Sequence, residues 1–223
     1  MPKIYPTIDR SGYKFFSGPY YTDWSNFYGA DASSMVATTG GNSSIFTTDQ
    51  SSGPALAEQK RYHVEFDISG ITSIPSNGTF NFYGGNTGLP STICVQASFA
   101  TAGAIVVGDW DSWNESSPVY YTDEIESWSS GYNVFTLTQT ALDFMGNPDN
   151  DEFQMICMDS VYHAIDAAPI ADGGESDPYF ETNLYYRMDV PGKEPYLDYT
   201  ILRQRLGVKS GILTLKSGKL IIK

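Results

Sequence analysis

Acidic side chains are the most abundant candidates for chemistry in this chain, which has 26 Asp or Glu and 13 Lys or Arg. They gather in three stretches that predict turns or loops: Asp109/Asp111, Asp149/Asp151/Glu152 and Asp172/Glu175/Asp177. Ca²⁺ takes several oxygen ligands from one flexible loop, so Asp149 and Asp151 are candidate ligands of a structural calcium ion. None of the clusters has the EF-hand spacing, and solvated acidic loops are the alternative. No other cofactor is expected.

Nucleophilic and phosphate chemistry have little support. Only two histidines are present, His63 and His163, and both lie in strand-like stretches that favour structural roles. The chain lacks the Gly-x-Ser-x-Gly motif of serine hydrolases and the glycine-rich motifs of nucleotide-binding loops. Carboxylate pairs for glycoside hydrolysis can be drawn from the acidic clusters, but so many acids make any such choice uninformative. The sequence therefore predicts a protein that is not an enzyme.

Trp110, Trp113 and Trp128 lie in or near predicted loops, beside many tyrosines. Exposed aromatic rings can stack on sugars, which makes these three residues candidates for glycan binding. Tryptophan can equally cap the end of a sandwich core, with the body of its ring buried. Both alternatives stay open.

Cys94 and Cys157 are the only cysteines, and each lies in an apolar run that resembles a strand. Free cysteine is among the most buried residue types, so two buried thiols are favoured. A disulfide is the alternative if the two strands are neighbours, and the sequence does not decide between them.

Charge is distributed very unevenly along the chain. Residues 62–186 contain 18 Asp or Glu and no Lys or Arg. Residues 1–200 carry a formal charge of −19, from 7 Lys or Arg and 26 Asp or Glu, whereas the residues after 200 carry +6. A body this acidic repels nucleic acid and anionic membranes, so neither is an expected partner. The basic end predicts a segment that docks on a partner, and a solubilising acidic surface with an incidental basic end is the alternative.

Abundant Tyr, Phe, Thr, Val and Gly favour antiparallel β-structure with many turns. Residues 61–67 alternate between apolar and polar side chains, which predicts a half-buried strand. Residues 1–60 are expected to form short strands separated by long loops, and residues 140–145 one or two helical turns that end at Gly146. Further strands are expected at 79–83, 93–99, 104–107, 119–121, 132–138, 153–158, 161–165, 183–190 and 196–202.

The alternation also predicts which side chains point inward between two sheets. The expected core residues are Tyr62, Val64, Phe66, Phe80, Phe82, Val95, Val134, Met155 and Tyr185. Many short strands with regular turn signals predict a sandwich or barrel. The start of the chain has no apolar signal-peptide region, and no apolar run approaches the ~18 residues that span a bilayer. We therefore expect synthesis in a cytoplasm.

The end of the chain nearly repeats itself, because residues 208–214 and 215–221 share the order Lys-Ser-Gly. Ser-Gly is a turn dipeptide, so we expect a hairpin with strands at 212–215 and 219–222. A lone hairpin is marginal in water and must pack on its own body or on a neighbour. The candidate partner-binding residues are Arg203, Arg205, Ile212, Leu213, Leu215, Lys216, Lys219, Leu220, Ile221 and Ile222.

Two segments carry a family resemblance. Residues 66–75, Phe-Asp-Ile-Ser-Gly-Ile-Thr-Ser-Ile-Pro, and the following Gly-Thr-Phe-Asn-Phe-Tyr-Gly of residues 78–84 resemble jelly-roll proteins of tailed phages and related DNRLRE-like surface modules. Residues 107–113, 132–142 and 195–201 fit the same scheme. The resemblance covers about residues 8–201 and implies a jelly-roll-like β-sandwich, similar to carbohydrate-binding modules. It defines no catalytic residues.

Together these observations predict an all-β protein with an antiparallel jelly-roll-like sandwich over residues 1–201 and a basic anchoring hairpin over 202–223. The resemblance implies a phage virion component, a decoration, head-fibre or tail-fibre subunit, whose partners are other virion proteins or identical subunits. The first alternative is a carbohydrate-binding module for host or mucosal glycans, and the second is a glycan-degrading enzyme. The particle position, copy number and symmetry do not follow from the sequence.

Overall fold

A computed structural model describes the backbone of residues 2–7, 11–21, 34–36, 42–50, 55–84, 91–99, 106–109, 111–126, 128–160, 182–185, 192–201, 213–216 and 219–222. Side chains are described for residues 2–7, 11, 61–84, 91–99, 106, 108–109, 111–126, 128–158, 160 and 192–201. The predictions for Trp110, His163, Arg203, Arg205 and Ile212 lie outside the described residues.

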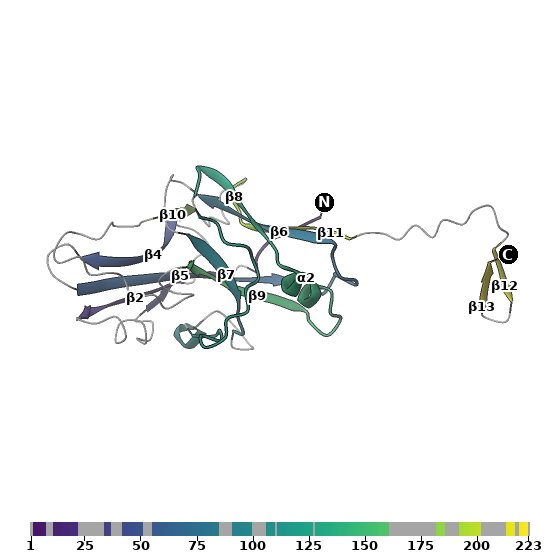
Figure 1. Cartoon of the computed structure of the whole chain (residues 1–223), viewed down its shortest axis with the longest axis horizontal. Helices are drawn as coiled ribbons and strands as arrows, with labels where there is room; N and C mark the ends of the chain where they lie inside the picture. Colours follow the sequence, from purple (N-terminus) through teal and green to yellow (C-terminus); the bar gives the residue numbers. More distant parts are fainter. Residues whose placement is uncertain are drawn as a thin grey trace.

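The described part of the chain consists mainly of antiparallel strands (Figure 1). The strands of the body are β1 (Lys3–Ile4), β2 (Gly12–Tyr21), β3 (Ser34–Val36), β4 (Asn42–Gln50), β5 (Ala55–Asp67), β6 (Asn77–Gly84), β7 (Thr92–Gln96), β8 (Gly131–Thr136), β9 (Glu152–Asp159), β10 (Thr182–Tyr185) and β11 (Tyr196–Thr200). A 3-10 helix, η2 (Val107–Asp109), and an α-helix, α2 (Gln139–Met145), lie between strands. The strands β2, β4 and β5 are longer than the short strands expected for residues 1–60.

The strands form two antiparallel sheets. In the first sheet β6 is central, with β11 and then β1 on one side and β8 on the other. The second sheet has the order β3, β2, β5, β9, β7. The strands β4 and β10 pair with each other and join the sheets, because β4 also pairs with β5 and β10 touches β6 at Gly84. The predicted antiparallel all-β architecture is therefore confirmed.

Aromatic side chains from the two sheets meet in the main core. Tyr62, Val64 and Phe66 of β5 are fully buried, as predicted. The ring centroids of Tyr62 and Phe82 are 4.6 Å apart, and those of Phe66 and Phe80 are 5.9 Å apart. These contacts join the second sheet to the first through hydrophobic burial. Met155 of β9 is also buried.

The prediction for Val134 is wrong. Val134 is 54% exposed, and its neighbour Phe135 is the residue of β8 that enters the core. A shift of one residue moves a side chain to the opposite face of a sheet, which explains the error. Val95 is buried as expected, but it belongs to a second apolar cluster with Phe99 and Trp113. The side chain of Tyr185 is not among those described.

The expected half-buried β5 is buried on both faces. Arg61 and His63 are fully buried and Glu65 is 4% exposed, whereas Asp67 is exposed as the alternation implies. The connection between β7 and β8 supplies the residues that cover this second face, as the contacts of Asp109 and Asp111 show. A strand pattern alone does not reveal a covering segment that lies elsewhere in the sequence.

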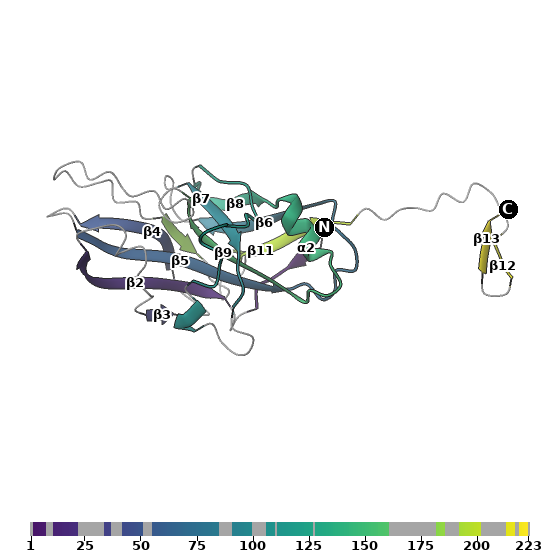
Figure 2. The ribbon, with the colours of Figure 1, turned by 60° about the horizontal axis from the view of Figure 1, so that its bottom comes forward.

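The helix α2 confirms the predicted helical turns. The hydroxyl of Thr138 accepts a hydrogen bond from the backbone N–H of Ala141 at 3.3 Å, and Gly146 ends the helix. Figure 2 shows α2 at one end of the sandwich, near β11. No helix in the described part of the chain is long and apolar enough to cross a membrane. The strand expected at 104–107 is not formed in its described part, since Val106 is 51% exposed and Val107 begins η2.

Candidate functional site

The C-terminal segment forms the hairpin that its sequence predicts. The strands β12 (Leu213–Lys216) and β13 (Lys219–Ile222) pair antiparallel, with Lys216 opposite Lys219. The described part of the first strand reaches Lys216, one residue beyond the expected end. Among the described strands, β12 and β13 pair only with each other, and both views draw the hairpin away from the two sheets (Figures 1 and 2).

The register of the hairpin divides its positions into two faces, because opposite residues of an antiparallel pair share a face. One face carries the positions of Leu213, Ile222, Leu215 and Leu220. The other carries Thr214, Ile221, Lys216 and Lys219. The first face is entirely apolar in sequence, and the second carries two lysines. Contact of these residues with a partner stays a prediction.

A second feature lies on the outer face of the sheet that contains β6. Four tyrosines form a continuous row there, one each from β6, β8 and β11 and one from the residue after β1. Ring centroids are 5.4 Å apart for Tyr83 and Tyr132, 5.2 Å for Tyr132 and Tyr196, and 6.3 Å for Tyr196 and Tyr5. Adjacent rings are tilted or edge-to-face, with interplanar angles of 87°, 68° and 55°. No two neighbouring rings of the row are therefore stacked face to face.

Two lysines lie against this row. The Nζ atom of Lys3 is 3.8 Å from the ring centroid of Tyr196, and that of Lys193 is 4.9 Å from the ring centroid of Tyr83. Both distances are typical of cation–π contacts. We call Tyr5, Tyr83, Tyr132 and Tyr196, together with Lys3 and Lys193, the Tyr–Lys face. It places positive charge on a body whose net charge is strongly negative.

Tyr132 lies at the centre of the Tyr–Lys face. Its hydroxyl donates a hydrogen bond to the backbone carbonyl oxygen of Glu194 at 2.9 Å. Burial, together with the nearby Glu194 carboxylate, raises the pKa of Tyr132 to about 12. This hydroxyl is therefore protonated at neutral pH.

The Tyr–Lys face is exposed enough to meet a ligand. Tyr5 is 52% exposed, the other three tyrosines are partly exposed, and Val134 adds a further exposed apolar side chain on the same face of the sheet. Aromatic side chains are enriched in protein interfaces, and exposed apolar patches mark interaction sites. The sequence prediction missed this face because it considered only tryptophans in loops. The alternation along β6 does indicate one of these residues. Phe80 and Phe82 point inward, so Tyr83, the next residue along the strand, points outward.

The second face of β5 carries a buried polar layer. The guanidinium of Arg61 lies 3.2 Å from the Asp111 carboxylate and 5.6 Å from the Trp113 ring centroid. The Nε2 atom of His63 lies 3.2 Å from the backbone carbonyl oxygen of Asp109. These contacts tie β5 to the connection between β7 and β8. They give His63 a structural position, in agreement with the role favoured by the sequence.

The polar layer continues through Gln154 on β9. Its amide nitrogen donates to the Glu65 carboxylate at 2.7 Å, and its amide oxygen accepts from the backbone N–H of Phe99 at 2.8 Å. Buried polar groups are stable when they are hydrogen-bonded. These two hydrogen bonds of Gln154 therefore hold the residues that follow β7 against β9. The side chains of this layer are all buried, which fits a structural role; they are Arg61, His63, Glu65 and Gln154.

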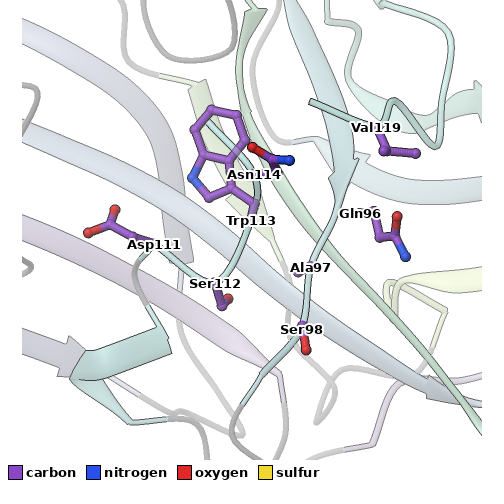
Figure 3. A pocket seen from close by; sticks show the side chains of 8 residues that line it. All are labelled: Gln96, Ala97, Ser98, Asp111, Ser112, Trp113, Asn114 and Val119. Carbon is purple, nitrogen blue, oxygen red and sulfur yellow. The ribbon is translucent and has the colours of Figure 1, made fainter. Parts of the chain in front are cut away.

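A pocket of about 370 Å³ lies beside this layer. It is lined by Gln96, Ala97, Ser98, Asp111, Ser112, Trp113, Asn114 and Val119. Figure 3 shows that these side chains come from the end of β7 and from the facing connection. Two backbone hydrogen bonds join the segments, from Gln96 N–H to the Val119 carbonyl at 2.8 Å and from Ser98 N–H to the Ser112 carbonyl at 2.7 Å. Its lining is mixed, with the apolar side chains of Trp113 and Val119 beside amide, hydroxyl and carboxylate groups.

The two described tryptophans are buried. Trp113 is 7% exposed and packs in the second apolar cluster, and Trp128 is 3% exposed and packs against Phe82 and Phe135. The indole N–H of Trp128 donates to the hydroxyl of Thr92 at 2.9 Å. Both rings are therefore buried in the core. This is the arrangement that the sequence predicts as the alternative to exposed, sugar-stacking rings. Glycan binding by the chain itself stays a prediction.

The candidate calcium ligands lie between α2 and β9. Asp149 and Asp151 are exposed, and the backbone N–H of Asp149 bonds to the side chain of Asn147. No group of three or more His, Cys, Asp or Glu side chains is arranged to hold a metal ion within the described ranges. The expectation of a calcium ion at this connection stays a prediction.

No protein-family model matches the chain, and no curated protein matches it.

Proposed function

We propose that this chain is a non-catalytic virion protein of a tailed phage, a decoration, head-fibre or tail-fibre subunit that docks through its C-terminal hairpin. The observation that carries this proposal is the separate β12–β13 sheet, which pairs with no other described strand. The jelly-roll-like sandwich is proposed on the family resemblance, and it fits the two antiparallel sheets. The partner is another virion protein or an identical subunit.

Physical chemistry supports a docked hairpin. An isolated two-stranded hairpin is marginally stable in water, so β12 and β13 gain stability from burial on a partner. The outer edges of the hairpin can extend a partner sheet by strand addition, and the positions of Leu215 and Leu220 lie on an apolar face suited to burial. Lys216 and Lys219 carry charge that complements an acidic surface, such as the −19 body of a neighbouring copy.

A pair of matched double variants tests which hairpin face docks. Leu215→Asp with Leu220→Asp places two acids on the apolar face, whereas Thr214→Asp with Ile221→Asp places two acids on the opposite face. The chain is produced together with the other particle proteins, and its recovery in the sedimented particles is measured. We expect the first variant to be lost from particles and the second to be retained more strongly. Full recovery of the first variant contradicts the proposal.

A second candidate function is carbohydrate binding, and the Tyr–Lys face is the observation that favours it. A row of partly exposed aromatic rings offers contact surface to sugars, and flanking ammonium groups add attraction for carboxylate or sulfate substituents. Lys3 and Lys193 cover part of the rings of Tyr196 and Tyr83, so a sugar that meets this face also meets positive charge. The ligand class that fits is an acidic glycan.

An array that contains acidic and neutral glycans tests this candidate. Tyr132→Ala alters the centre of the Tyr–Lys face, and Thr136→Ala alters an exposed position farther along the same strand, β8. Binding of acidic glycans that is lost in the first variant and kept in the second supports the candidate. Absence of binding by the unaltered chain, or equal binding by both variants, contradicts it.

A further inference from the structure

The two cysteines of the chain face each other across neighbouring strands. Cys94 of β7 is directly opposite Cys157 of β9 in the antiparallel register. Their Sγ atoms are 2.7 Å apart, although the residues are 63 positions apart in the sequence. Both are fully buried free thiols in the main core.

The hydrogen bonds of Cys94 define the type of cross-strand pair. Its backbone N–H donates to the hydroxyl of Thr122 at 3.0 Å, and its carbonyl accepts from the N–H of Tyr121 at 2.9 Å. Both backbone groups of Cys94 therefore point away from β9. The ladder three positions farther along agrees, because the N–H of Ala97 donates to the carbonyl of Gln154 on β9 at 3.1 Å. Hydrogen-bonded and non-hydrogen-bonded pairs alternate, so an odd separation from this pair makes Cys94 and Cys157 a non-hydrogen-bonded pair.

Cys94 and Cys157 thus form a non-hydrogen-bonded pair of an antiparallel ladder. In such pairs the Cα atoms are about 4.5 Å apart and the side chains approach closely. Disulfides need a Cα separation of about 4.4–6.8 Å. The backbone of β7 and β9 therefore already has the spacing that a disulfide requires.

We propose that Cys94 and Cys157 form an intramolecular disulfide when the chain folds in the presence of a small-molecule disulfide such as oxidised glutathione. The first thiolate attacks one glutathione sulfur and displaces a glutathione thiolate, which leaves a mixed disulfide. The second cysteine, as thiolate, attacks the protein sulfur of this mixed disulfide and displaces the second glutathione. Two protein thiols are oxidised, one glutathione disulfide is reduced to two thiols, and the two thiol protons end on glutathione.

Burial determines when this reaction occurs. Desolvation raises the pKa of the Cys157 thiol, so the reactive thiolate is scarce in the folded protein. A glutathione adduct has no room between Cys94 and Cys157, because both side chains are fully buried. The bond therefore forms during folding or after local opening, and once formed it is protected from reductants by the same core.

The experiment compares two routes to oxidation of the full chain. Reduced protein is unfolded in denaturant and refolded with oxidised glutathione, and a parallel folded sample receives the same reagent. Free thiols are then titrated under denaturing conditions, and intact mass is measured without reductant. We expect the refolded monomer to have no free thiols and no glutathione adduct. The folded sample should keep both thiols for much longer.

Thermal unfolding supplies the second readout. The oxidised monomer should unfold about 5–15 °C higher than the reduced monomer, the size typical of a disulfide that closes a long loop. Cys94→Ser and Cys157→Ser cannot form the bond, and their Tm should not respond to the oxidant. Two free thiols after oxidative refolding, a glutathione adduct, a disulfide-linked dimer, or an oxidised monomer with a lower Tm overturns the proposal.

Discussion

Replacement of Phe66 by alanine tests the packing of the two sheets most sharply. Phe66 is fully buried on β5, and its ring meets Phe80 of the facing sheet at an angle of 74°. It also lies opposite Phe153 of β9 in the register. Removal of the phenyl group eliminates transfer free energy and leaves a cavity that the surrounding rings only partly fill. Such substitutions cost about 3–5 kcal/mol of the free energy of unfolding.

Equilibrium unfolding in urea, followed by tryptophan fluorescence, measures this cost. With a slope of about 2–3 kcal/mol/M, the midpoint should fall by roughly 1–2 M. Val134→Ala is the matched control, because Val134 is an apolar strand residue that is 54% exposed. Its free energy of unfolding should change by less than about 0.5 kcal/mol. A loss below about 1 kcal/mol for Phe66→Ala, or equal losses for both variants, would refute the packing of β5 against β6.

Three further predictions concern charged and titratable groups. Asp111→Ala should lower the free energy of unfolding by about 1–3 kcal/mol in urea unfolding, because the buried Arg61 loses one hydrogen-bond acceptor, and an unchanged midpoint contradicts this. The pKa of Tyr132 is about 12 in the folded state and near its ordinary value of 10 in the unfolded state. The unfolded state therefore loses this proton first, and the free energy of unfolding falls as the pH rises from about 10 to 12. Tyr132→Phe should flatten this decrease in a series of Tm measurements, and parallel curves for both proteins would count against it. Residues 1–200, with a net charge of −19, should not bind DNA or RNA at physiological salt, and a sub-micromolar Kd in fluorescence anisotropy would show otherwise.

The sequence predicted the elements whose pattern depends on their own residues. Alternation placed Tyr62, Val64 and Phe66 on the buried face of β5, and the pattern at the end of the chain predicted the pairing of β12 with β13. The helix α2 followed from a short run that ends at a glycine. In each case the signal is local, because strand period, turn type and helix cap are encoded within a few residues.

The errors arise where a distant segment determines burial. Arg61 and His63 have the polar character of a solvent-facing strand side, yet the connection between β7 and β8 covers them. Val134 and Phe135 are both apolar, so alternation alone leaves two registers, and packing against the facing sheet selects Phe135. The Tyr–Lys face depends on the lateral order of β1, β11, β6 and β8, which local patterns do not specify.

Deletion of residues 207–223 tests the proposed docking most directly. The measurement is the amount of truncated chain recovered in sedimented particles, with the far-ultraviolet circular dichroism and Tm of the purified chain as controls for folding. The account predicts that the two-sheet body keeps its spectrum and Tm and that the truncated chain is absent from the particles. Recovery of the truncated chain at the level of the full chain, or unfolding of the body after the deletion, would contradict it.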